Sequence, residues 1–188
     1  LIELYDYNES QFEDFWRAFM LAIYKLVSFD KPFVSAITGH APAGGCVLSI
    51  CSDYRVMAEG KYKIGLNEIP VGIIVPPSIF ENYAFWLGKR KAYQYLLEGK
   101  LHTVEEALQI GLIDEAVPLK EVNEVALKKL KLYTKFDQTA WGATKRNCKA
   151  DLVAISTPKN DEHFENAIKQ WWKPEVLSLI HISEPTRR

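Results

Sequence analysis

A long amphipathic segment, a proline and a short apolar run follow one another near the start of the chain, and this order constrains the fold most. Over residues 8–29 the apolar side chains recur at steps of three and four residues, which predicts an amphipathic helix. Ser10 and Glu13 have the spacing of a capping box at its start. Pro32 cannot continue a helix, and residues 33–38 predict a short buried strand. A helix that leads into a buried strand favours an α/β fold.

The composition limits the possible partners. The chain has 188 residues, of which 48% are hydrophobic and 25% charged, as is typical of a folded globular domain. Its 23 basic side chains nearly balance the 24 acidic ones, so no net field attracts nucleic acid or anionic lipid. No apolar run reaches the roughly 18 residues that a membrane span needs. We therefore expect neither a nucleic-acid nor a membrane partner.

The cysteines and histidines indicate no metal site. The 3 cysteines form no C-x-x-C pair, which argues against a disulfide framework and a zinc ribbon and fits a reducing compartment. The 4 histidines lack the spacing of metal ligands. We expect the site to contain no metal.

After the first strand, predicted strands and helices continue to alternate up to residue 118. The predicted strands cover residues 54–58, 62–64 and 114–117, and the predicted helices cover residues 43–52, 77–87, 89–98 and 103–110. Thr103 and Glu106 have the spacing of another capping box. Beyond Pro118 the pattern is helical, over residues 121–133, 139–149 and 161–172. We therefore expect a core over residues 1–118 and a helical region over residues 119–176.

The end of the chain has a different character. Residues 177–187 have the sequence L-S-L-I-H-I-S-E-P-T-R, which resembles the translation of a transposon-end adapter used in sequencing libraries. We expect residues 177–188 to be a non-native tail with no part in fold or function.

The first candidate for chemistry is the run A-P-A-G-G-C at residues 41–46, between a predicted strand and a predicted helix. Adjacent glycines let a ligand approach the backbone closely, and the first N–H groups of a helix can hold an anion or an oxyanion. The spacing matches neither a dinucleotide-binding loop nor a P-loop. Taken alone, the run also fits a tight packing turn that binds nothing.

The second candidate is the run I-G-L-N-E at residues 64–68, which leads into an apolar segment rich in proline. The carboxylate of Glu68 is isolated in this segment. Desolvation there would raise its pKa towards that of a useful general base. Taken alone, Glu68 also fits a surface glutamate in a loop.

Five motifs occur in a fixed order along the chain. They are S-A-I-T-G-H-A-P-A-G-G-C at residues 35–46, C-S-D-Y-R-V-M-A at 51–58, I-G-L-N-E-I-P-V-G-I at 64–73, L-L-E-G-K at 96–100 and E-A-L-Q-I-G-L-I-D-E-A-V-P at 106–118. In this order and spacing they resemble the crotonase superfamily, the enoyl-CoA hydratase/isomerase family. The resemblance covers most of residues 1–118. It makes two interpretations much weaker, namely that residues 41–46 form a packing turn that binds nothing and that Glu68 is a surface glutamate.

The resemblance implies a crotonase fold, a spiral of ββα turns followed by helices that pack between subunits of a homotrimer or hexamer. It also implies an acyl-CoA thioester as substrate, with coenzyme A as part of the substrate and no separate cofactor. Gly44 matches the glycine whose backbone N–H binds the thioester oxygen in this family. One such donor in an oxyanion hole typically contributes about 10²- to 10³-fold in rate.

The number of carboxylates favours a subtype. Family members that add water to the double bond are similar to one another in two glutamates. One directly follows the cysteine of the turn that matches residues 41–46, and the other lies in the loop that matches residues 64–68. This chain has Val47 at the first position and Glu68 at the second. A single base can move a double bond, whereas hydration also needs a group that activates water. The local strings are most similar to Δ3,Δ2-enoyl-CoA isomerases of fatty-acid degradation, with Asn67 as a second polar contact to substrate.

The resemblance also has departures. A second oxyanion donor lies in the family in a segment of the type S-A-G-L-D, and Leu1 follows the place of that segment. We therefore expect a chain truncated at its N-terminus, and cut near Pro174 at its other end. The isolated chain should be inactive and marginally folded. The sequence leaves open a bacterial cytoplasm or a mitochondrial matrix.

Two other classes of function stay open on the sequence. One is a different crotonase-type acyl-CoA enzyme, namely a hydratase, a hydrolase or a decarboxylase. The other is a non-catalytic homologue that binds acyl-CoA. Glu68 in an apolar loop argues against the second class, because a scaffold has no use for a buried carboxylate.

Overall fold

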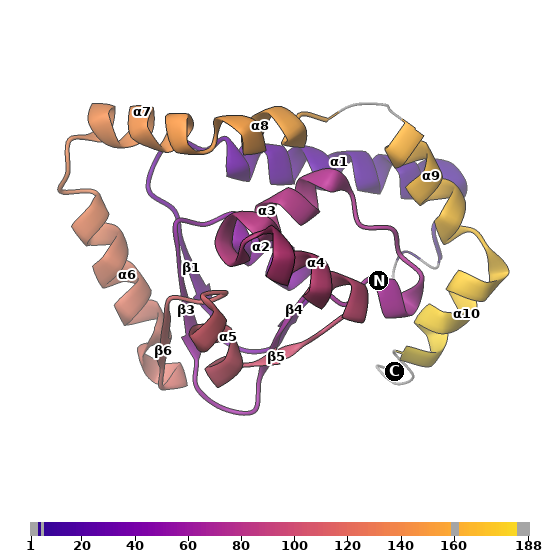
Figure 1. Cartoon of the computed structure of the whole chain (residues 1–188), viewed down its shortest axis with the longest axis horizontal. Coiled ribbons are helices and arrows are strands. Elements are labelled where there is room, and N and C mark those ends of the chain that lie inside the picture. Colours follow the sequence, from indigo (N-terminus) through magenta and orange to yellow (C-terminus); the bar gives the residue numbers. More distant parts are fainter. Residues whose placement is uncertain (1–3, 5, 159–161, 184–188) are drawn as a thin grey trace.

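The computed structural model describes residues 4, 6–158 and 162–183, and in this part of the chain helices surround two small β-sheets (Figure 1). The strands are β1 (Val34–Ile37), β2 (Ala41–Pro42), β3 (Tyr54–Ala58), β4 (Lys63–Gly65), β5 (His102–Thr103) and β6 (Glu115–Val117). The helices are α1 (Glu9–Val27), α2 (Gly44–Ile50), α3 (Pro77–Leu87), α4 (Lys89–Glu98), α5 (Val104–Ile110), α6 (Val122–Tyr133), α7 (Gln138–Cys148), α8 (Ala150–Ser156), α9 (Glu162–Trp171) and α10 (Pro174–Ser183), with the short 3-10 helices η2 (Ile69–Val71) and η3 (Leu119–Glu121).

The chain passes from one sheet to the other in each ββα turn. One sheet has the order β1-β3-β6 with parallel neighbours, and the other has the order β2-β4-β5, in which β4 and β5 are antiparallel. The first turn is β1, β2 and α2, and the second is β3, β4 and, after η2, α3. Because β3 lies beside β1 and β4 beside β2, the second turn stacks directly on the first. The expected α/β class is confirmed.

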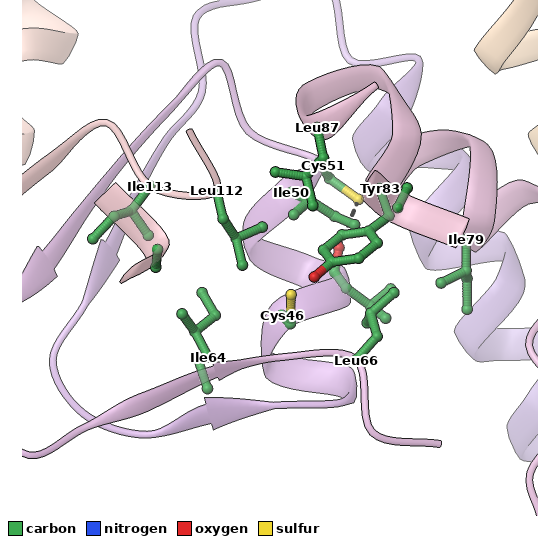
Figure 2. Packing of buried hydrophobic residues seen from close by; sticks show 14 of the residues in the cluster. Cys46, Ile50, Cys51, Ile64, Leu66, Ile79, Tyr83, Leu87, Leu112 and Ile113 are labelled. Carbon is green, nitrogen blue, oxygen red and sulfur yellow. Dashed lines mark hydrogen bonds between the residues drawn. The ribbon is translucent and has the colours of Figure 1, made fainter. Parts of the chain in front are cut away.

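Helix α2 lies at the centre of the main hydrophobic core. Figure 2 shows Cys46 and Ile50 of α2, and Cys51 directly after it, together with Tyr83 of α3 and Leu112. All five side chains are fully buried. A Cβ at Gly45 would lie 3.3 Å from the Cβ of Ala41 in β2, so the lack of a side chain at Gly45 lets β2 approach α2 closely. The helix predicted over residues 43–52 is observed with the shorter bounds Gly44–Ile50.

The start of α1 differs from the prediction in one respect. The capping box is formed by Asn8 and Gln11, and the predicted pair of Ser10 and Glu13 is wrong. Asn8 Oδ1 accepts from the Gln11 N–H at 3.0 Å, and Gln11 Oε1 accepts from the Asn8 N–H at 3.0 Å. Asn8 has the extended backbone of an N-cap residue, so the helix begins directly after it.

The helices beyond residue 118 run along the outside of the core (Figure 1). Helix α8 packs on α1 and α3, and α10 packs on η2. The ring of Trp171 in α9 stacks on Phe12 of α1, with centroids 4.5 Å apart. The helix predicted from residue 161 is described from Glu162, because residue 161 lies outside the described residues. Helix α10 spans the predicted boundary at residue 177, and residues 184–188 of the predicted tail are outside the described range.

Buried ionic groups join the outer helix α7 to the core. Asp53, which precedes β3, is paired with Lys145 at 2.7 Å and with Lys149 at 3.6 Å. The same carboxylate accepts from the N–H of Phe33 at 2.9 Å.

None of the helices in the described part of the chain combines the length and apolar character that crossing a membrane requires.

Candidate active site

A cavity of about 560 Å³ opens between α1, the first residues of α2 and the turn that follows β4. Gly44, Asn67 and Glu68, the three site residues predicted from the sequence, all line it. They come from two successive ββα turns, which the stacking of β4 on β2 brings together. A cavity of this size is in the range that holds a small-molecule ligand.

The Gly44 turn has an unusual backbone. Ala43 has φ 46° and ψ −117°, a conformation that L residues rarely adopt. The Ala43 N–H donates to the carbonyl of Gly65 at 2.9 Å, and the Ala43 carbonyl accepts from the Val47 N–H at 2.9 Å. These bonds hold the turn in place on both sides. The N–H of Gly44 belongs to the first turn of α2, where backbone donors have no acceptor within the helix.

Glu68 lies at the start of η2, and its backbone is fixed. Its carbonyl accepts from the N–H groups of Val71 and Ile73, each at 3.1 Å. The side chain is only 8% exposed, and Oε2 has no hydrogen-bond partner in the structure. Burial raises the pKa of Glu68 from 4.5 to about 7, against a smaller opposite effect of its backbone N–H. The interpretation of Glu68 as a surface glutamate is therefore wrong.

Two neighbours of Glu68 shape the same end of the cavity. Asn67 Oδ1 is buried without a hydrogen-bond partner, so a polar acceptor faces no protein donor here. Val47, at the position of the missing second carboxylate, is fully buried and apolar. Among the described residues that line the cavity, Glu68 is the one carboxylic acid. A proton transfer in this cavity therefore has one carboxylate available.

The turn that carries Glu68 is held from outside by α4. Gly99 ends α4 in the left-handed conformation, with φ 58°. A Cβ at Gly99 would collide with the ring of Pro70 in η2. The absence of a side chain at Gly99 thus lets Pro70 pack against the end of α4, and this packing fixes the turn directly after Glu68.

One wall of the cavity was not predicted from the sequence. Phe15, Trp16 and Phe19 of α1 line it, although the helical periodicity indicated only an apolar face. Phe15 is 38% exposed, whereas Phe12 on the same helix is 1% exposed and packs on Trp171. The signal that could have found this wall is the unusual number of aromatic residues, more than a single core-facing stripe needs.

One known protein family matches most of the chain. The profile described as enoyl-CoA hydratase/isomerase matches residues 1–168.

The chain belongs to the enoyl-CoA hydratase/isomerase family.

Curated members of this family include isomerases and hydratases. The mitochondrial enoyl-CoA delta isomerase 1 of Mus musculus is 40% identical over 127 residues, which are 67% of this chain and 44% of that protein. The Homo sapiens protein of the same name is 30% identical over 183 residues, 97% of this chain and 61% of that protein. A probable enoyl-CoA hydratase of Mycobacterium avium is 33% identical over 105 residues, 56% of this chain and 40% of that protein. The chain thus spans about half the length of the curated relatives it matches.

Solved structures of the enoyl-CoA hydratase/isomerase family agree with the fold. The human mitochondrial delta3-delta2-enoyl-CoA isomerase superposes with a TM-score of 0.89 at 28% identity, covering 96% of this chain and 70% of that one. An enoyl-CoA isomerase of Mycobacterium tuberculosis superposes with a TM-score of 0.72 at 30% identity, covering 84% of this chain and 66% of that one. The crotonase fold expected from the sequence is confirmed.

Proposed function

We propose that the protein to which this chain belongs is an enoyl-CoA isomerase of fatty-acid degradation. It shifts the double bond of a 3-enoyl-CoA to give 2-trans-enoyl-CoA. The observation that carries this proposal is Glu68, the one buried carboxylate among the described residues that line the cavity, together with the apolar Val47 in the same lining. The delta isomerases among the relatives support it at family level.

The proton transfer uses Glu68 twice. Its carboxylate takes a proton from C2 of the substrate, and the electron pair of the broken C–H bond delocalises over the thioester and the C3–C4 double bond. The same group then returns the proton to C4, which leaves the double bond between C2 and C3. A pKa of about 7 suits both steps, because the group is then a competent base and a competent acid near neutral pH.

The thioester oxygen becomes negatively charged in the intermediate, and a backbone donor stabilises it. We assign this role to the N–H of Gly44, which is held in place by the hydrogen bonds of Ala43. Asn67, whose Oδ1 has no protein partner, is a second polar contact to the acyl-CoA. Coenzyme A is part of the substrate, so the reaction needs no separate cofactor.

We propose a homotrimer or hexamer as the assembly, which the sedimentation of the complete protein tests.

Hydration is the alternative reaction. It requires a group that orients and deprotonates water in addition to the group that delivers a proton to carbon. Among the described residues that line the cavity Glu68 is the one carboxylic acid, and the apolar Val47 in place of a second acid disfavours a bound water there.

The test uses the product of the complete gene, with wild type, Glu68→Gln and a control variant, Glu59→Gln. Glu59 is exposed and lies outside the cavity. Mixed with a 3-enoyl-CoA, wild type should generate the absorbance of the conjugated 2-enoyl thioester. Glu68→Gln should lower kcat/KM by about 10²-fold or more, and Glu59→Gln should leave it unchanged. Equal activity of wild type and Glu68→Gln would remove Glu68 from the mechanism. In a second assay the same proteins are mixed with a 2-enoyl-CoA. Loss of the absorbance of this thioester, without isomerisation of the 3-enoyl-CoA, would instead identify a hydratase.

A further inference from the structure

Three aromatic side chains form a continuous strip along one wall of the cavity. Phe19 and Phe15, one turn apart on α1, have nearly parallel rings with centroids 6.2 Å apart. Tyr7, just before α1, meets Phe15 edge to face at 6.4 Å. All three line the cavity that contains Glu68. We call Tyr7, Phe15 and Phe19 the aromatic strip.

The strip begins at the Gly44 turn. The Cζ atom of Phe19 lies 4.0 Å from the place that a Cβ of Gly44 would occupy. Phe15 and Tyr7 follow in that order, each in contact with the ring before it. A ligand whose carbonyl lies at Gly44 therefore meets Phe19 with its first carbons and the other two rings with later ones.

Phe15 presents exposed apolar surface to the cavity. Aromatic side chains usually pack against the core, as Phe12 does on Trp171. Phe15 instead keeps 38% of its surface exposed, and it faces the cavity. The same cavity is also lined by the apolar Ile73 and Ile74, which follow η2. An apolar chain bound there would cover surface that the protein leaves uncovered.

We propose that the aromatic strip binds the distal acyl chain, and that Phe15 makes the enzyme prefer long unbranched acyl groups over short ones. This inference rests on the proposed function, because it assumes that the thioester end lies at Gly44. A short acyl group ends beside Phe19, whereas a longer chain reaches Phe15 and Tyr7. Each methylene buried against the strip should strengthen binding about fourfold.

The activity test compares 3-hexenoyl-CoA with 3-dodecenoyl-CoA on the product of the complete gene. Wild type should have at least about tenfold higher kcat/KM for the longer substrate. Phe15→Ala should lose about tenfold on the longer substrate and less than about twofold on the shorter one. The matched control is Phe85→Ala, because Phe85 is a helical phenylalanine of similar exposure, 43%, outside this cavity. It should change neither value. A ratio between the two substrates that Phe15→Ala leaves unchanged would overturn the proposal.

A binding test separates this inference from the proposed function and from a folding defect. Decanoyl-CoA and butyryl-CoA carry no double bond, and calorimetry measures their affinities without any reaction. Decanoyl-CoA should bind more tightly to wild type, and Phe15→Ala should abolish most of the difference. Phe15→Leu, which keeps an apolar side chain and the fold, should restore most of it.

The two proposals can fail separately. If wild type isomerises neither enoyl thioester but binds decanoyl-CoA in a manner that depends on Phe15, the isomerase proposal fails and the acyl-chain site stands. If wild type isomerises both thioesters and no affinity depends on Phe15, the isomerase proposal stands and the acyl-chain site is wrong.

Discussion

The guanidinium carbon of Arg55 lies 3.7 Å from the centre of the Trp86 ring. Arg55 on β3 is fully buried and forms an ion pair with Asp114, next to β6. The indole N–H of Trp86 donates to the carbonyl of Ile50 at 2.7 Å, so the same ring also contacts the end of α2. This stack joins α3, α2 and the parallel sheet around one buried charge. Burial lowers the pKa of Arg55, and Asp114 opposes this effect.

Removal of Asp114, the partner of the buried Arg55 charge, should lower the free energy of unfolding. Asp114→Ala leaves Arg55 buried without its carboxylate, and we expect the free energy of unfolding to fall by about 3–5 kcal/mol in urea denaturation. The control is Asp30→Ala, because the Asp30 pair with Arg146 is half-exposed. It should cost less than about 1 kcal/mol. Equal effects of the two substitutions would contradict a special role of the buried pair.

The desolvation of Glu68 should destabilise the fold at high pH. The folded pKa of about 7 is above the ordinary 4.5, so the folded state binds more protons than the unfolded state between these values. The free energy of unfolding therefore falls as the pH rises from about 4.5 to 7. Glu68→Gln has no such dependence and should be more stable than wild type at pH 8 by roughly 2–4 kcal/mol, with little difference at pH 4. Unfolding curves at both pH values check the sign, and a less stable Gln variant at pH 8 would refute it.

His102 should make the protein sensitive to acid. Both ring nitrogens are buried without partners, and the ring lies 4.6 Å from that of Tyr95. Burial lowers the pKa of His102 from 6.5 to about 4, so between these values the unfolded state binds the extra proton. Stability due to the neutral ring is lost as the pH falls from 6.5 towards 4.

The substitution that tests this is His102→Leu, with the exposed His163→Asn as the control. Wild type and His163→Asn should lose roughly 2–3 kcal/mol more than His102→Leu between pH 7 and pH 4. Parallel loss of stability in all three proteins would assign the acid sensitivity to other groups.

Two glycines in the same backbone conformation should respond differently to alanine. Gly99 and Gly111 both end a helix in the left-handed region, with φ 58° and 80°. A Cβ at Gly111 meets no atom within 4 Å, so Gly111→Ala should cost only the backbone strain, about 1 kcal/mol. Gly99→Ala also collides with Pro70, and should cost at least about 1 kcal/mol more and lower kcat/KM by shifting Glu68. Thermal unfolding and initial rates of both variants measure this, and matching values would show that the Pro70 contact is unimportant.

Much of the fold follows from local signals. The predicted helices over residues 77–87 and 89–98 have the observed bounds, because Pro77 begins the first and Gly88 and Gly99 end the two. The strand over residues 54–58 is also observed with these bounds. In contrast, β2 and β5 were not predicted. Each has two residues, and pairing with β4 rather than local propensity makes them strands.

The candidate site, like the fold, has parts that local sequence signals predict and a part that they do not. Gly44 and Glu68 carry local signals, a glycine pair at a helix start and an isolated carboxylate in an apolar run. The cavity wall on α1 carries only its number of aromatic residues as a signal, because periodicity indicates which face of a helix is apolar but not what that face contacts. Phe12 and Phe15 have the same side chain on the same helix, yet one packs on Trp171 and the other faces the cavity. The catalytic roles of Gly44, Asn67 and Glu68 stay predictions.

The two halves of the cavity come from separate stretches of sequence. The groups assigned to the reaction lie on the start of α2 and the turn after β4, while the aromatic strip lies on α1 and just before it. Helix α2 has little room to vary, since Cys46, Val47 and Ile50 are fully buried. Directed evolution of this protein would therefore have a natural division of targets. A library confined to residues 7–19 could change which acyl groups are accepted, while the proton-transfer residues stay untouched.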